Sequence, residues 1–99
     1  MEKRCCICGK TFIEYANNAS PIKNGVCCDY CNIKYIIPGR LIVASAYSGV
    51  NFEIVKTKKQ LDDLEEKLCK KNFWKMQSGS HLSIYQNPES EEKVVVCII

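Results

Sequence analysis

The sequence has no long apolar segment of the kind that spans a membrane or forms a signal peptide. Its longest apolar run, Val94 to Ile99, is far shorter than the ~20 residues of a membrane span, so we expect no membrane partner. The start of the chain, residues 1–6, has no apolar signal segment. We therefore expect a cytoplasmic protein whose cysteines stay reduced.

Histidine and clustered charge are also scarce. The chain has one histidine, His81, and 14 Lys and Arg against 11 Asp and Glu, without a block of like charge. A strongly basic nucleic-acid binder and an H-N-H nuclease, which needs a second histidine, are therefore excluded. Because phosphate loops and G-x-S-x-G motifs are missing too, we expect no enzyme.

Cysteine, in contrast, is abundant. Eight cysteines occur in 99 residues, and four of them form two C-x2-C steps separated by 19 residues. This spacing is typical of zinc sites, because two thiolates on each of two tight turns complete a tetrahedron around one ion. The sequence predicts one structural Zn²⁺ held by Cys5, Cys8, Cys28 and Cys31.

The ligand set has alternatives. Disulfides are the competing interpretation for so many cysteines, and Cys6 or Cys27 could replace a neighbouring ligand. We prefer the x2 pairs because Gly9 follows Cys8, where a zinc knuckle often needs a backbone conformation that glycine adopts freely. Cys69 and Cys97 lie in apolar contexts and are predicted to be buried core thiols.

A four-cysteine site is closed, and this has two consequences. It leaves no coordination position for a reactive water, so the predicted site builds structure and does not catalyse. Four thiolates with Zn²⁺ also contribute about −2, which lowers the formal charge of +3 to about +1.

The first half is predicted to be a zinc-binding lobe, residues 1–48, with a treble-clef-like arrangement. Asn24-Gly25 suggests a tight hairpin turn. After the second cysteine pair we expect a short helix over residues 29–37, stopped by Pro38-Gly39, and another over residues 40–47. Ser48-Gly49 is the expected hinge.

The second half, residues 49–99, is predicted to be an α+β lobe of order β-α-β-β-β. Thr57 and Gln60 form a capping box before a helix over residues 58–71, which has leucines at helical spacing. A single helix on a mainly antiparallel sheet follows from this order. The expected strands are residues 52–56, 73–77, 81–86 and 93–98, with a turn at 87–90.

Residues 5–41 resemble a leader of small phage and prophage proteins. The resemblance rests on a doubled cysteine in each knuckle and an Ile-Pro-Gly-Arg step after the second. The family's Gly-Asn-Asn is replaced here by Ala16 before Asn17-Asn18. The resemblance implies a protein in a bacterial host that occupies a host protein, most concretely an anti-CRISPR protein that inhibits a Cas9-type effector or another defence nuclease.

Two other functions compete. Residues 61–98 resemble HicA-type toxins through Gly79-Ser80-His81, which implies a ribonuclease that uses His81; Asn72 departs from the family's glycine. Nucleic-acid binding by the first lobe is the other alternative, although an ordinary surface explains the same dispersed residues. These residues are Lys3, Arg4, Lys10, Lys23, Lys34 and Arg40, with Tyr15, Tyr30 and Tyr35.

Overall fold

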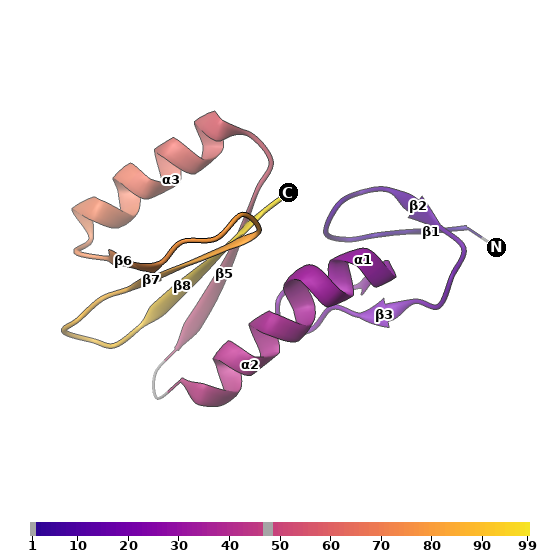
Figure 1. Ribbon diagram of the computed structural model, residues 1–99, viewed down its shortest axis with the longest axis horizontal. Coiled ribbons are helices and arrows are strands. Elements are labelled where there is room, and N and C mark those ends of the chain that lie inside the picture. Colours follow the sequence, from indigo (N-terminus) through magenta and orange to yellow (C-terminus); the bar gives the residue numbers. More distant parts are fainter. Residues whose placement is uncertain (1, 47–48) are drawn as a thin grey trace. The chain divides into compact units, whose positions relative to one another are not determined.

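The computed structural model describes residues 2–46 and 49–99 and divides the chain into two compact units (Figure 1). Unit 1 spans Met1–Ala44 and unit 2 spans Ser45–Ile99. The fold class is α+β, as predicted. Tyr47 of the predicted second helix and Ser48 of the predicted hinge lie outside the described residues.

Unit 1 begins with two small antiparallel hairpins. In the first, Lys3 lies opposite Phe12, and in the second, Asn17 lies opposite Cys27. Strands of two residues bury little surface, so other interactions must stabilise this unit. The strands are β1 (Lys3–Arg4), β2 (Thr11–Phe12), β3 (Asn17–Asn18) and β4 (Val26–Cys27).

The helical part of unit 1 runs without a break through Pro38, so the prediction of a stop at Pro38-Gly39 is wrong. It consists of α1 (Asp29–Cys31), a π-helical turn η1 (Asn32–Ile36) and α2 (Ile37–Ser45). Proline lacks the N–H that an α-helix needs and crowds the carbonyl four residues earlier. The wider π turn ends at Ile36, and the Ile37 N–H donates to the carbonyl of Asn32, five residues earlier. Pro38 then stands at the second position of α2.

The connection between β3 and β4 also differs from the prediction. Asn24-Gly25 does not form a two-residue hairpin, because residues 19–25 separate the two strands. The Ala19 N–H donates to the Gly25 carbonyl at 3.1 Å, and Ala19 and Ile22 are buried. The loop therefore contributes apolar side chains to the interior of unit 1. Gly25 is still required, since its φ of +120° is unfavourable for other residues.

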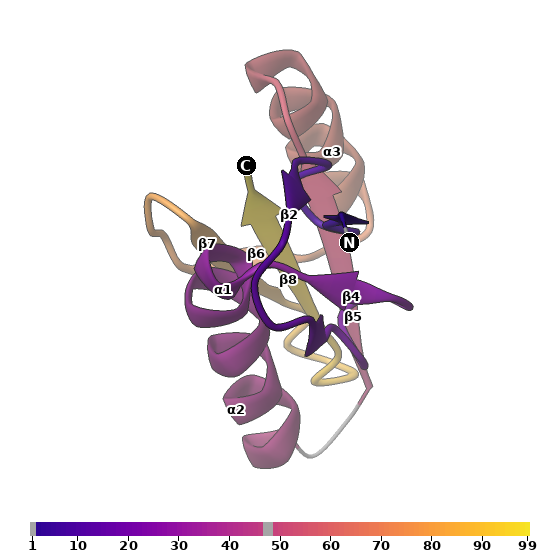
Figure 2. The same ribbon diagram turned by 90° about the vertical axis from the view of Figure 1, so that its right-hand side faces the viewer.

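Unit 2 is a four-stranded sheet with one helix on one face (Figure 1). The strand order is β5-β8-β7-β6; β5 and β8 are parallel, with arrows in the same direction in Figure 2, and the other two pairings are antiparallel. The prediction of a mainly antiparallel sheet is confirmed. The elements are β5 (Val50–Val55), α3 (Lys58–Lys70), β6 (Trp74–Gln77), β7 (Leu82–Gln86) and β8 (Lys93–Ile98).

The core of unit 2 lies between α3 and the sheet. Leu68 of α3 is buried with Val55, Tyr85, Val94 and Val96, and Leu61, Leu64, Phe73 and Ile98 pack around this cluster. Cys97 is buried, as predicted. Cys69 is exposed, and the prediction of a core thiol is wrong there, because residue 69 lies about 100° around the helix from Leu68.

One polar network borders this core. The Tyr85 hydroxyl donates to Glu65 Oε2 at 2.9 Å, and Lys75 Nζ lies 3.0 Å from the same oxygen. The ammonium of Lys75 also lies 5.6 Å from the centre of the Tyr85 ring. The bonds from Lys75 and Tyr85 lower the pKa of Glu65. The pKa of Tyr85 is raised, mainly by burial and to a smaller extent by its hydrogen bond to Glu65. The buried tyrosine hydroxyl is thereby satisfied at the edge of the core.

The predicted capping box at the start of α3 is confirmed. Thr57 Oγ1 accepts a hydrogen bond from the Gln60 N–H at 3.1 Å, and Gln60 Oε1 accepts one from the Lys56 N–H at 2.7 Å. We expect Thr57→Ala to lower the free energy of unfolding of unit 2 by about 1 kcal/mol, since the Gln60 N–H loses its partner. Urea denaturation followed by the fluorescence of Trp74 measures this loss. Thr57→Ser is the control and should be nearly neutral, because it keeps the accepting oxygen.

Candidate metal centre

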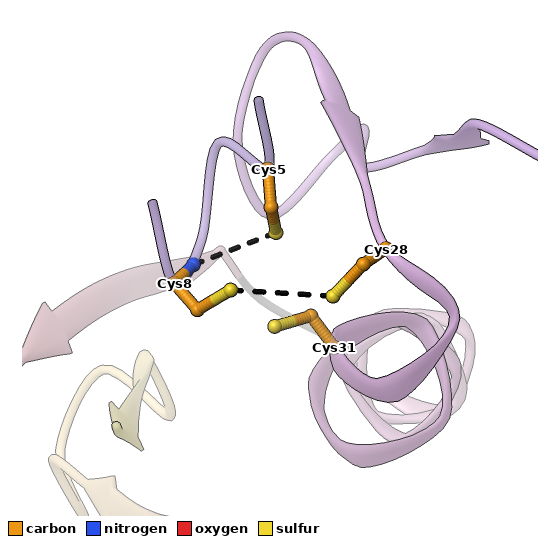
Figure 3. A group of neighbouring side chains, drawn as sticks. All are labelled: Cys5, Cys8, Cys28 and Cys31. Atoms are coloured by element: carbon orange, nitrogen blue, oxygen red, sulfur yellow. Dashed lines mark hydrogen bonds between the residues drawn. The ribbon is translucent and has the colours of Figure 1, made fainter. Parts of the chain in front are cut away.

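The four cysteines of the two C-x2-C steps lie together in unit 1. Their sulfur atoms are all within 4.8 Å of one another, and Figure 3 shows the four side chains converging on one point. The Sγ atoms of Cys8 and Cys28 are 4.0 Å apart. A tetrahedral ion with metal–sulfur bonds of ~2.3 Å needs sulfur atoms about 3.8 Å apart, so this group of thiols could hold a metal ion.

The first pair occupies a tight turn between β1 and β2. Cys5 Sγ accepts hydrogen bonds from the backbone N–H groups of Ile7 at 3.4 Å and Cys8 at 3.5 Å. The turn is closed by the Gly9 N–H, which donates to the Cys5 carbonyl at 3.0 Å. Gly9 has a φ of +79°, which confirms the predicted need for glycine after the second thiol.

The second pair occupies the start of the helical segment. Cys28 is the N-cap of α1, with extended backbone angles, and Cys31 is the last residue of α1. Three residues make almost one helical turn, so both side chains can face the same point. The free N–H groups of a helix start also favour negative charge on nearby sulfur atoms.

Polar contacts hold the second hairpin, β3-β4, and its loop against the helical segment, and the sequence did not predict them. Asn17 Nδ2 donates to Asp29 Oδ1 at 2.8 Å and to the Cys27 carbonyl at 3.3 Å. The Arg40 guanidinium donates to the carbonyls of Ser20 at 3.0 Å and Asn18 at 2.6 Å. These bonds connect positions up to 22 residues apart, and the local patterns available in a sequence do not reveal such partners.

The two remaining cysteines of unit 1 lie outside this group of four thiols. Cys27 is fully buried, and Cys6 is half-buried, with its Cβ 3.3 Å from the place that a Cβ on Gly25 would take. Burial is the main cause that raises the pKa of Cys27 to about 11, and the charges of neighbouring thiols add to it. The same two causes raise the pKa of Cys6. The sulfur atoms of Cys6 and Cys27 are not part of the group of four that lie within 4.8 Å of one another, so their position disfavours them as metal ligands.

The pKa values of Cys5, Cys28 and Cys31 are shifted in different directions. Burial alone would raise the pKa of Cys5, but the N–H groups that donate to its sulfur outweigh burial and lower this pKa to about 6. Burial raises the pKa values of Cys28 and Cys31, and hydrogen bonding to neighbouring thiols adds to the increase for Cys31. Without a cation, the Cys5 thiolate is thus favoured, whereas ionisation of Cys28 and Cys31 is opposed. A bound metal supplies the charge that allows all four thiols to ionise.

The other predicted functional residues do not join this site. His81 is half-buried directly before β7 and its carbonyl accepts from the Ile98 N–H at 2.8 Å. In residues 2–46 and 49–99, the four cysteines are the only group of three or more possible metal ligands. Tyr35, proposed as a stacking ring, is buried and cannot face a nucleic acid, and Arg40 is bound to backbone carbonyls.

Within the described part of the chain, no helix is both long and apolar enough to cross a membrane. Comparisons with models of protein families, with curated proteins and with solved structures found no match.

Proposed function

We propose that Cys5, Cys8, Cys28 and Cys31 bind one Zn²⁺ and that this site is structural. The cluster of four thiols supports the proposal most directly, because soft thiolates select zinc and four of them fill its tetrahedron. The combination of a hairpin knuckle with a helix start is typical of a treble clef. A filled site offers no position for a substrate or a reactive water, so its expected contribution is to fold unit 1.

We further propose that the chain acts by binding and inhibiting a host defence nuclease, most concretely a Cas9-type effector. Two features support this function: the resemblance of residues 5–41 to phage leaders, and a thiol cluster suited to a closed site. A protein that works by occupying its target needs a stable scaffold and an exposed surface, and it needs no catalytic residues. Unit 1 would supply the zinc-stapled scaffold.

Inhibition can be measured with a purified Cas9-type effector, its guide RNA and a DNA target. We expect the zinc-loaded chain to bind the effector and to reduce DNA cleavage in proportion to the amount added. A matched sample of the Cys28→Ser variant should inhibit much less, because unit 1 is then unfolded. A panel of such effectors and other defence nucleases that all cleave normally at saturating amounts of the chain would contradict the proposed function.

The ribonuclease alternative has its own test. The position of His81 next to Gly79-Ser80 is the observation in its favour. If the chain cleaves RNA, and His81→Ala abolishes the cleavage while Ser80→Ala does not, the second function replaces the first. We expect neither variant to differ from the native chain, which should leave RNA intact.

A further inference from the structure

A cavity at the edge of the sheet in unit 2 combines apolar side chains with one carboxylate. It has a volume of about 450 Å³ and is lined by Trp74, Met76, Gln86, Pro88 and Glu91. We call it the edge cavity. Pockets for small ligands measure about 300 to 1,000 Å³ and have mostly apolar and aromatic linings with a few polar groups, so its size and lining suit a bound side chain or small molecule.

The sheet brings three different side chains together at the edge cavity. Trp74 and Gln86 lie directly opposite each other in β6 and β7, and such residues share a face. The next pair, Lys75 and Tyr85, contacts α3, so Trp74 and Gln86 face away from this helix. The register shifts at Met76, as in a β-bulge, which redirects a side chain. A ring, a thioether and an amide therefore line one cavity, and the ring and thioether are 66% and 63% exposed.

The turn between β7 and β8 supplies negative charge. It carries Glu89, Glu91 and Glu92 against one cation, Lys93, at the start of β8. Of these four residues, Glu91 lines the edge cavity. Within residues 2–46 and 49–99, none of the three carboxylates forms an ion pair or accepts a side-chain hydrogen bond. The charge at the edge cavity is thus not compensated by the described part of the chain, and it is complementary to a cation.

Backbone hydrogen bonds order the turn that carries Glu91. The Glu91 N–H donates to the Asn87 carbonyl at 2.8 Å, and the Asn87 N–H donates to the Glu92 carbonyl at 3.0 Å. Asn87 Oδ1 also accepts from the Glu89 N–H at 2.9 Å. The backbone beneath the carboxylate is therefore ordered before a ligand arrives, which reduces the entropy cost of binding.

We propose that the edge cavity binds the guanidinium group of an arginine side chain from a partner protein. The face of an indole ring attracts cations, and a planar guanidinium stacks on it while its N–H groups donate to a carboxylate. Trp74 and Glu91 offer these two partners, and the Gln86 amide oxygen offers a further acceptor. A lysine ammonium is more strongly hydrated and has no flat face. A purely apolar group would shield the Glu91 carboxylate from water without replacing its hydrogen bonds.

This site is separate from the proposed metal centre and from the proposed inhibition of a nuclease. All of its lining residues belong to unit 2, so binding requires only that unit 2 is folded. A negative result here would therefore leave both other proposals unchanged.

Titration of the full chain with acetyl-arginine amide tests the proposal. Trp74 is the sole tryptophan, so its indole N–H signal in NMR spectra reports directly on the edge cavity. Concentrations from about 0.1 to 50 mM cover the expected millimolar dissociation constant, because a single small ligand makes few contacts. Acetyl-citrulline amide has nearly the same shape without the charge, and it should bind about tenfold more weakly or worse.

Two variants and one matched control test the residues. Glu91→Gln should raise the dissociation constant about tenfold or more, and so should Trp74→Leu, followed through the amide signals of β6. Glu89→Gln removes the same charge from the same turn outside the edge cavity. At about 0.15 M salt this control should change the constant less than about threefold, since charges away from the contact are largely screened. Dispersed amide signals verify that unit 2 folds in each variant.

Four results would overturn the proposal. The first is an indole signal that does not move at the highest concentration of acetyl-arginine amide. The second is equal binding of the arginine and citrulline compounds, and the third is an equal effect of Glu91→Gln and Glu89→Gln. The fourth is tighter binding of tetramethylammonium chloride than of acetyl-arginine amide, which would assign the edge cavity to a quaternary ammonium ligand instead.

Discussion

Replacing Cys28 with serine is expected to remove the metal and unfold unit 1 in the full chain. Unit 1 has strands of two residues and spans 44 positions, a size at which a protein core alone rarely suffices. Binding of a structural zinc supplies about 10 to 16 kcal/mol in small metal-dependent domains. A serine in place of one of the four thiols should forfeit most of this free energy. Cys5→Ser should have the same effect and also remove the sulfur that accepts two N–H groups.

Zinc content and NMR spectra measure this effect. The native chain should contain about one zinc, and Cys28→Ser should contain far less. The amide signals of residues 2–44 should collapse into the unfolded range, whereas those of the sheet of unit 2 stay dispersed. Cys69→Ser is the matched control, because Cys69 is exposed and far from the cluster in sequence, and it should keep both its zinc and its spectrum.

Two results would change the ligand assignment. If Cys28→Ser keeps its zinc and Cys27→Ser loses it, Cys27 is the ligand, despite its burial and its raised pKa. A native chain purified under reducing conditions that contains no zinc, and that neither gains structure on addition of zinc nor loses it to a chelator, would contradict a metal site altogether. We expect chelation to unfold unit 1 and addition of zinc to restore it.

The features that the sequence predicted correctly depend on local patterns. Thr57 and Gln60 lie three residues apart, and a capping box needs nothing beyond this distance. Strand β8 is apolar along most of its length, which is typical of a central strand with both faces covered. The cysteine pairs were also predicted from local patterns, because each C-x2-C step is a short turn. The two steps are connected only by the requirement of one metal ion for four ligands.

The errors arose where packing decided between local alternatives. Pro38 indicates a helix end in most sequences, but a π turn accommodates it here, and residues 29–45 stay helical. Asn24-Gly25 is a strong hairpin signal, but burial of Ala19 and Ile22 draws the chain into a longer loop. Cys69 directly follows the buried Leu68, but it lies about 100° around α3 from that leucine, beside Lys70, and it is exposed.

We expect the Leu68→Ala variant to lose about 3 kcal/mol of the stability of unit 2. Leu68 is buried among Val55, Tyr85, Val94 and Val96, so truncation leaves a cavity that the sheet cannot close. Leucine to alanine changes at such positions cost about 2.7 to 5 kcal/mol. Unit 2 spans 55 positions, for which the total stability is about 3 to 8 kcal/mol. The variant should therefore be close to unfolding at room temperature.

Urea denaturation of the full chain measures this loss through the fluorescence of Trp74, the sole tryptophan, which lies in β6. The midpoint should fall strongly while the slope of the transition stays unchanged, because the surface exposed on unfolding is the same. Leu61→Ala is the matched control: the same atoms are removed from a side chain that is only partly buried, so the loss should be about half as large. Equal losses for the two variants would mean that Leu68 is not the centre of this core. A loss below about 1 kcal/mol for Leu68→Ala would mean that α3 does not pack on the sheet as the structure describes.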